Sequence, residues 1–244
     1  ELVGVKNILN EIDVIRLGYT ILRTLGLDDV KILINTLGDE ESRNAYKVAL
    51  KEYFKDHIEH MCPDCKSRYE VNPLRILDCK VKEDREIIKD CPKISAYLSQ
   101  ESNERFDKVL KYLDALNIPY EIDDNLVRGL DYYSETVFEF HYTSKKGINY
   151  GASGAGGHYD KLVSEFGGPQ LDGVGFSFGV ERVLSVLTDD GFNSKLIGPI
   201  DVYVLPLDEG VVPVAYQALP ILQAFGYRCE INLDGTKLGT QIKK

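Results

Sequence analysis

The stretch LVRGLDYYSETVFEF, residues 126–140, restricts the possible folds of the chain more than any other segment. Its second half is rich in Thr, Val and Phe, a composition typical of a β-strand. Ahead of that strand, Arg128 can supply a fixed cation for a phosphate or a carboxylate, and Gly129 lets the backbone approach a ligand closely. Tyr132 and Tyr133 add ring faces and hydroxyl donors. The alternative is an ordinary turn into a strand, with Arg128 in a surface ion pair.

The first half of the chain predicts helices interrupted by one strand. Apolar residues recur at spacings of three and four over 7–26 and again over about 40–60, which predicts two amphipathic helices. Between them, the β-branched run VKILIN at 30–35 predicts a buried strand. Residues 62–92 show no such period and are expected to be irregular. Ser102 is expected to cap a further helix.

The second half changes to strands and glycines. INYGASGAGG at 148–157 is dense in glycine, and GVGFSFG at 173–179 predicts a strand that leads into the helix VERVLSVL at 180–187. With the strand after Arg128, these segments predict a sheet-rich core. The fold class is therefore α+β, with a helical insertion at about 37–117 ahead of most of the sheet.

A different pattern begins near Gly198. DVYVLP, VPVAYQALPILQAFG and YRCEINL predict a strand, a helix and a second strand, which is a βαβ unit with parallel strands. We therefore expect two domains, 1–196 and 197–244. The second ends after one crossover, whereas a domain of about 100 residues is usual, so we expect it to be cut short. The first residue is Glu and not Met, which also predicts a cut or processed product.

The cysteines raise the question of a metal site. No signal peptide is visible and the cysteine count is five, so reduced thiols in a cytoplasm are the default. CPDC has the CxxC spacing of a zinc knuckle, and a tetrahedral site could be completed as Cys62, Cys65, Cys79 and Cys91. The last two do not form a second CxxC, so reduced structural thiols are favoured over zinc.

The net charge of −10 disfavours binding to nucleic acid through the overall field, because phosphate contacts need Lys and Arg. A local basic patch can suffice. The candidates are Lys145, Lys146, Lys237, Lys243 and Lys244, and for each of them a solvated surface lysine is the favoured interpretation. The sequence has no run of 18 or more apolar residues, so no transmembrane helix and no membrane partner are expected.

Three segments resemble the signature motifs of the histidyl-tRNA synthetases. RGLDYY with its T-V-F-E strand resembles the first histidine-specific motif. GAGGHYDKLVSEFGG at 154–168 resembles the second, and GVGFSFGVERVL at 173–184 resembles motif 3 of the class II synthetases. ELVG at the start resembles the strand that follows motif 2, so the resemblance covers the whole chain. It implies a partial class II antiparallel sheet core, followed by the start of an α/β anticodon-binding domain.

The resemblance implies a histidine–tRNA ligase, which activates histidine with ATP to histidyl-adenylate and transfers it to tRNA(His). Arg128 is then the catalytic residue, because it would lie between the substrate carboxylate and the α-phosphate and act electrostatically. Arg182 would bind ATP by stacking on the base and contacting phosphate; the alternative is an ion pair with Glu181. Gly175 and Gly179 suit a strand that lies close to the adenine ring. Mg²⁺ is expected with ATP.

The resemblance also implies a histidine pocket. Tyr133 and Tyr159 would contact the imidazole, because a slot with hydroxyl partners discriminates a ring that carries N–H groups. Glu1 would hold the α-amino group. The full implied set is Glu1, Arg128, Leu130, Tyr132, Tyr133, Gly156 and Tyr159. For Gly156 the alternative is a tightly packed strand without a ligand. His158 stands where the family commonly has Arg, and His, unlike Arg, loses its charge as the pH rises through its pKa of about 6.5.

The chain lacks motifs 1 and 2, which the family uses for the dimer interface and for the α-phosphate. We therefore expect these residues alone to be nearly inactive. The resemblance implies that the full-length parent is a cytoplasmic homodimer. A second interpretation is a synthetase-like regulatory subunit of histidine biosynthesis, which binds histidine or a partner enzyme without charging tRNA. A third is a metal-stabilised binding module centred on 62–92. The complete RGLDYY segment and the α/β unit after it favour the synthetase.

Overall fold

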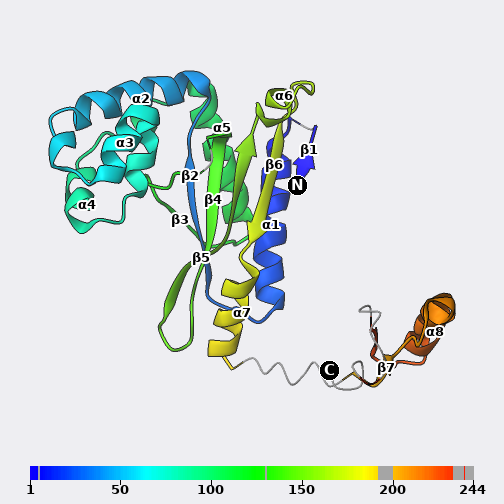
Figure 1. Cartoon of the computed structure of the whole chain (residues 1–244). Coiled ribbons are helices and arrows are strands. Elements are labelled where there is room, and N and C mark those ends of the chain that lie inside the picture. Colours follow the sequence, from blue (N-terminus) through cyan, green and yellow to red (C-terminus); the bar gives the residue numbers. More distant parts are fainter. Residues whose placement is uncertain (5, 130, 192–199, 233–238, 240–244) are drawn as a thin grey trace. The chain divides into compact units, whose positions relative to one another are not determined.

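A six-stranded sheet forms the centre of the first part of the chain (Figure 1). In the computed structural model, the strand order is β1-β6-β5-β4-β2-β3. Every neighbouring pair is antiparallel except β2 and β3, which run parallel. The strands are β1 (Leu2–Val3), β2 (Val30–Thr36), β3 (Tyr120–Ile122), β4 (Tyr133–Thr143), β5 (Asn149–Tyr159) and β6 (Gly173–Phe178). This mostly antiparallel sheet with helices confirms the predicted α+β class.

The structure describes residues 1–4, 6–129, 131–191, 200–232 and 239. The chain divides into two compact units, Glu1–Gly191 and Phe192–Lys244. The domain boundary that we expect at 196 falls on residues 192–199, which lie outside the described part, so that boundary stays a prediction.

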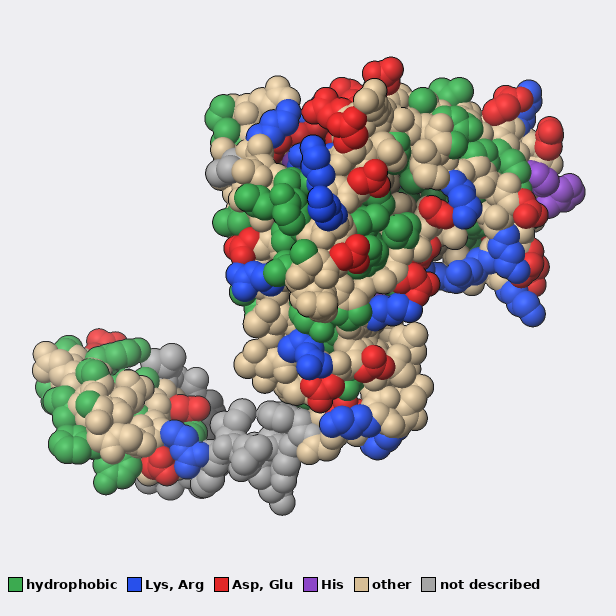
Figure 2. All heavy atoms as spheres, turned by 180° about the vertical axis from the view of Figure 1, so that it is seen from behind, with side chains coloured by type: hydrophobic (Ala, Val, Ile, Leu, Met, Phe, Trp, Pro, Cys, Tyr) green, Lys and Arg blue, Asp and Glu red, His purple; other side chains and the backbone are tan. Residues whose placement is uncertain are grey.

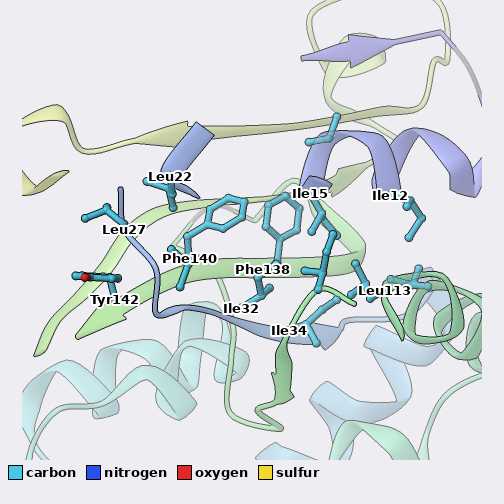
Figure 3. Packing of buried hydrophobic residues seen from close by; sticks show 14 of the residues in the cluster. Ile12, Ile15, Leu22, Leu27, Ile32, Ile34, Leu113, Phe138, Phe140 and Tyr142 are labelled. Atoms are coloured by element: carbon cyan, nitrogen blue, oxygen red, sulfur yellow. The ribbon is translucent and has the colours of Figure 1, made fainter. Parts of the chain in front are cut away.

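One face of the sheet packs against α1 (Ile8–Thr24). Side chains alternate along β4, and Phe138 and Phe140 point to the side where Ile15 and Leu22 of α1 lie (Figure 3). All four side chains are fully buried. Helix and strand approach closely at Gly18, where an added Cβ would lie 2.4 Å from the ring of Phe140. The core therefore occupies this face and leaves the opposite face of β4 for other contacts.

The helical insertion contains more regular structure than the sequence predicts. Residues 62–92 are not irregular, because they form two short α-helices and a 3₁₀-helix. The expected helix at 40–60 ends at Phe54. The elements of this region are α2 (Glu40–Phe54), η1 (Ile58–His60), α3 (Pro63–Val71), η2 (Pro73–Asp78), α4 (Lys82–Ile88) and η3 (Ile94–Ala96). In Figure 1 the helices α2, α3 and α4 gather on one side of the sheet.

The next helix, α5 (Gln100–Ala115), begins earlier than expected. Its N-cap is Ser99, whose side chain accepts a hydrogen bond from the backbone N–H of Ser102. Ser102 itself is buried inside the first turn, where its hydroxyl donates to Glu135 at 2.9 Å. The predicted cap was therefore wrong by one turn. Helix α5 packs beside α1 and completes the cover of this face.

Two helices follow strands of the sheet. The short α6 (Leu162–Glu165) comes after β5, and α7 (Val180–Asp189) comes directly after β6 as predicted. Helix α7 buries Val183, Val186 and Leu187, which belong to the main core. The first turn of α7 is thereby fixed at the end of β6, next to the glycine-dense strand β5.

The second unit has the predicted βαβ order. It consists of β7 (Val202–Val204), η5 (Glu209–Val211), α8 (Val212–Ala224) and β8 (Cys229–Ile231). The two strands pair in parallel, with Val202 opposite Cys229. This confirms the parallel crossover.

The surface carries charges of both signs. Figure 2 shows acidic and basic side chains interspersed over one face of the first unit. Of the candidate basic residues, Lys146 is paired with Asp189 at 2.6 Å, whereas Lys237, Lys243 and Lys244 lie outside the described residues. Within the described part of the chain, no helix is both long and apolar enough to cross a membrane.

Candidate functional site

A cavity of about 720 Å³ opens on the face of the sheet opposite α1. It is built from β4, β5 and β6, the segment before β4 and the start of α7. Both arginines that the sequence singles out, Arg128 and Arg182, line it, although they are far apart in the chain. Its lining consists of Arg128, Glu139, Tyr150, Ala152, Ser153, Gly154, Ala155, Ser177, Gly179, Glu181, Arg182 and Ser185. The structure therefore brings together three of the four predicted ATP-binding residues.

Arg128 is held at the cavity wall by a carboxylate. Its guanidinium forms a partly buried ion pair with Glu139 of β4. The other oxygen of Glu139 lies 2.8 Å from Nε2 of His141. Burial would raise the pKa of Glu139, but the hydrogen bond with His141 and the charge of Arg128 outweigh it and lower that pKa. Glu139 is thus a carboxylate that fixes the position of Arg128, and this pair replaces the surface ion pair considered above.

Arg182 reaches the same cavity from the first turn of α7. Its Nη1 donates to the backbone carbonyl of Ala152 at 2.6 Å. The ion pair with Glu181 does not form, and among the described residues no carboxylate pairs with Arg182. The arginine bonds to a backbone carbonyl, so its positive charge stays available to an anion in the cavity.

Three tyrosines and a carboxylate form a second group on the same face. Tyr133 and Tyr159 are opposite each other in β4 and β5, and Tyr132 packs on both rings at centroid distances of 4.6 Å and 5.8 Å. The hydroxyl of Tyr159 donates to Glu1 Oε2 at 2.7 Å. Burial raises the pKa of Tyr133 and of Tyr159, so both hydroxyls stay protonated at neutral pH. The group offers ring faces, hydroxyls and one negative charge.

Arg128 and Glu1 both lie close enough to this group for their charges to act on it. The charges of both act on Tyr133, the arginine lowering its pKa and the glutamate raising it. An anion beside Arg128 and a cation beside Glu1 would therefore both be near Tyr133, and a zwitterionic amino acid carries both charges. The face combines such a slot with a cavity that holds two cationic side chains.

Comparison with known proteins assigns the family. The model of the family described as histidyl-tRNA synthetase matches residues 1–183. The chain belongs to the histidyl-tRNA synthetase family. It is 41% identical over 244 residues to the histidine–tRNA ligase of Lactiplantibacillus plantarum, and 40% identical over 243 residues to that of Bacillus subtilis. Each match covers 100% of this chain but only 57% of the relative, so the chain spans little more than half the length of these relatives.

Solved structures of the family have the same fold. The apo histidyl-tRNA synthetase of S. aureus is 31% identical, with a TM-score of 0.66, and the match covers 99% of this chain and 59% of that one. The histidyl-tRNA synthetase of Nostoc sp. PCC 7120 is 19% identical with a TM-score of 0.52, which shows a shared fold. The resemblance in the signature motifs is thus confirmed at the level of family and fold.

Several glycines of the sheet leave space for the tyrosine group and Glu1. A Cβ at Gly157 would lie 2.8 Å from the ring of Tyr133, and one at Gly173 would lie 2.2 Å from the ring of Tyr159. A Cβ at Gly175 would lie 2.0 Å from the carboxylate of Glu1. Gly175, predicted to lie along ATP, therefore belongs to the tyrosine and carboxylate side of the face and does not line the cavity.

Of two other predicted pocket residues, one differs from expectation and one lies outside the described residues. A Cβ at Gly156 would point to the carbonyl of Gly175 and to the side chains of Phe138 and Phe176, which lie toward the core. Close packing therefore explains this glycine, and Gly157 is the one that faces the tyrosines. Leu130 lies outside the described residues.

His158, at the position where the synthetase family commonly has Arg, points away from the cavity. The side chain is 6% exposed; Nδ1 lies 3.1 Å from Ser134 Oγ, and Nε2 lies 3.6 Å from Asp172 Oδ2. Burial lowers the pKa of His158, so the ring is neutral at pH 7. This residue is a core histidine in the structure and supplies no charge to the candidate site.

The predicted cysteine set is also changed. Cys62, Cys65 and Cys79 come together, but their fourth neighbour is Asp84 and not Cys91. Cys91 is buried elsewhere, next to Tyr46. All five cysteines are free thiols.

Sequence reasoning missed Glu139 and His141. Both lie on β4 at a spacing of two, on the face opposite Phe138 and Phe140. Polar residues at alternate positions of a strand usually indicate a solvated face, so the pattern alone did not mark them. Their signal was the nearby Arg128, which requires a counter-charge when it is partly buried.

Proposed function

We propose that this chain carries the sites for histidine and ATP of a histidine–tRNA ligase. In the intact homodimeric enzyme it activates histidine to histidyl-adenylate, and the histidyl group is then transferred to tRNA(His). The observation that carries the proposal is that Arg128 and Arg182 line one cavity beside a slot of tyrosines and Glu1. The names of the curated relatives, histidine–tRNA ligases, support the transfer to tRNA. This function implies a cytoplasmic location.

In the activation step, the carboxylate of histidine attacks the α-phosphorus of ATP. An O–P bond forms to the carboxylate, the bond to the β-phosphate oxygen breaks, and pyrophosphate leaves with that electron pair. Negative charge builds on the α-phosphoryl oxygens in the transition state. Arg128 is already fixed by Glu139, so its charge stabilises these oxygens without reorganisation. Arg182, at the other wall of the cavity, binds the nucleotide.

The tyrosine group selects and orients the amino acid. Glu1 binds the α-ammonium group, while Arg128 attracts the α-carboxylate. The protonated hydroxyls of Tyr133 and Tyr159 bond to the imidazole nitrogens. Side chains without a matching N–H or acceptor would not form these bonds, which disfavours other amino acids.

The cavity also fits Mg²⁺ that arrives with ATP. Mg²⁺ is usually held by one or two carboxylates together with substrate phosphates. The cavity lining contains two carboxylates, Glu139 and Glu181, and the first is engaged by Arg128 and His141. Glu181 is therefore the residue that would contact the ion. When bound, Mg²⁺ neutralises phosphate charge and favours departure of pyrophosphate.

The test is histidine-dependent exchange of pyrophosphate into ATP by the intact protein that contains this chain. We expect Arg182→Ala to raise the KM for ATP much more than the KM for histidine, and Tyr159→Phe to do the reverse. The matched control is Arg16→Ala, since Arg16 is exposed on α1 and pairs only with Asp13 at 2.6 Å among the described residues. Absence of exchange in wild type would refute the proposal. Histidine binding without exchange or tRNA charging would instead indicate a regulatory subunit.

A further inference from the structure

Three cysteine sulfurs and one carboxylate meet inside the helical insertion. The ligand atoms of Cys62, Cys65, Cys79 and Asp84 all lie within 4.8 Å of one another. Cys65, Cys79 and Asp84 are 0%, 4% and 2% exposed, so they form a nearly closed cluster. Cys62 caps α3, Cys65 lies in its first turn, Cys79 ends η2, and Asp84 lies in α4. The four donors therefore join three separate elements.

The spacing of the sulfurs matches a tetrahedral thiolate site. Zinc–sulfur bonds of about 2.3 Å at tetrahedral angles place two sulfurs about 3.8 Å apart. Cys62 Sγ and Cys79 Sγ are 3.8 Å apart. A disulfide would need about 2.05 Å, so the two sulfurs are not bonded to each other. The backbone N–H of Cys65 donates to Cys62 Sγ at 3.4 Å, which orients that sulfur toward the cluster.

The carboxylate occupies the fourth corner. Asp84 Oδ2 lies 3.2 Å from Cys79 Sγ and accepts a bond from the backbone N–H of Cys62 at 3.1 Å. A zinc ion with one oxygen and one sulfur ligand places them roughly 3.6 Å apart, so a small outward movement of Asp84 Oδ2 from its 3.2 Å contact with Cys79 Sγ would accommodate the ion. A buried acid beside three sulfurs is costly unless a cation or hydrogen bonds compensate its charge.

Two of the three elements around the cluster, α3 and α4, bury few side chains of their own, whereas η2 also buries Pro73, Leu74, Ile76 and Leu77. Helix α3 buries only one residue, Cys65. Helix α4 buries only Asp84 and Ile88. The buried side chains of these helices are thus mostly the same side chains that point into the cluster. Short helices that bury few apolar side chains would gain stability from a metal ion that joins them.

We propose that one Zn²⁺ binds in this cluster as a closed structural site formed by Cys62, Cys65, Cys79 and Asp84. The three thiols release their protons to solvent and bind as thiolates, and Asp84 supplies the fourth ligand atom. All four positions belong to the protein, which leaves no place for a reacting water and separates this site from catalysis. The ion holds α3, η2 and α4 together independently of the proposed synthetase activity.

The experiment uses the intact protein, purified under reducing conditions and stripped with a chelator. Zinc alone is then added, and uptake is measured by mass spectrometry of the metal and by competition with a chromophoric chelator. We expect one zinc per chain for wild type. Loss of groups that merely orient a ligand costs about 10–100-fold in affinity, so Cys79→Ser and Asp84→Asn should each lose more than about 100-fold. Cys91→Ser, which removes a buried thiol outside the cluster, should bind as wild type.

A second readout does not depend on the variants. Cobalt added to stripped wild type should give the visible bands and the thiolate charge-transfer band of a tetrahedral cysteine site, and zinc should quench them. Zinc should also raise the Tm of wild type but not that of Cys79→Ser. The proposal is overturned if reduced wild type takes up no zinc, if its cobalt spectrum lacks thiolate bands, or if Cys91→Ser loses zinc as Cys79→Ser does. Oxidation of Cys62 and Cys79 to a disulfide, with no uptake after reduction, also overturns it.

Discussion

Replacing Arg128 by Ala separates the catalytic from the structural contribution of the Arg128–Glu139 pair. The side chains of these residues are 24% and 17% exposed, so the pair is neither fully solvated nor fully buried. Arg128→Ala removes the cation but leaves Glu139 in place, with His141 at 2.8 Å as its remaining partner. The variant should therefore lose both reaction rate and stability of the fold.

The two losses have different expected sizes. Removal of one preplaced charge from the transition state should lower histidine-dependent pyrophosphate exchange by about 10²–10³-fold, since one such donor typically contributes about 3–4 kcal/mol. The free energy of unfolding should fall by about 1–3 kcal/mol, which is the cost of leaving a buried acceptor without its partner. The lower end is expected, because His141 remains and because solvent screens part of the charge.

A double variant tells the two effects apart. In Arg128→Ala with Glu139→Gln, the buried side chain is neutral, so the free energy of unfolding in urea should recover most of its loss. Exchange should stay about 10²–10³-fold below wild type, because the missing cation is not restored. Recovery of exchange in the double variant, or near-normal exchange in the single variant, would refute the role of Arg128 in the reaction.

Three further predictions concern the sheet and helix α1, which packs on it. Gly157→Ala should raise the KM for histidine with little change in the KM for ATP, because its Cβ would lie 2.8 Å from the ring of Tyr133. Gly18→Ala should lower the free energy of unfolding by about 1–3 kcal/mol through overpacking, because its Cβ would lie 2.4 Å from Phe140. His158 has a pKa that burial lowers from 6.5, so it takes up a proton on unfolding; its stabilising effect is present above that pH and is lost as the pH falls through the lowered value.

Each of these predictions has a control. For Gly157→Ala, steady-state kinetics give the KM for histidine and the KM for ATP. Equal rises in the two KM values would contradict the prediction. In urea unfolding, Phe140→Leu combined with Gly18→Ala should recover part of the loss; a Gly18→Ala variant as stable as wild type would exclude the steric reasoning. His158→Gln should flatten the loss of Tm below pH 6.5, whereas the exposed His60→Gln should not.

Periodicity predicted the parts of the fold that bury apolar faces. Helix α1 and strand β2 were found because their apolar residues recur at the helical and strand periods. Helix α3 was missed for the opposite reason: its sequence PDCKSRYEV buries only Cys65, so no apolar stripe exists to detect. Ser99 and Ser102, three residues apart, offer the same capping hydroxyl, so the sequence alone does not decide which of the two begins the helix.

Periodicity does not predict the candidate site, because the register of the sheet brings its residues together. Arg128 and Arg182 were assigned from family motifs; no spacing rule predicts that they share a cavity. The register supplies that link: Gly154 of β5 pairs with Phe140 on one side and with Phe178 on the other, which aligns the end of β6 with the middle of β4. Arg182 follows the end of β6, and Glu139, which holds Arg128, precedes Phe140.

The same register explains why the glycines divide between two roles. Successive residues of β5 face opposite sides, so Gly156 meets Phe138 in the core while Gly157 meets Tyr133 at the tyrosine group. A substitution at Gly156 should therefore disturb stability first, and one at Gly157 should disturb histidine binding first. A run of glycines in the sequence cannot show this division, because a residue without a side chain gives no apolar or polar signal of its face. Strand pairing with β4 supplies that information, and it also places His158 in the core between two positions of the site.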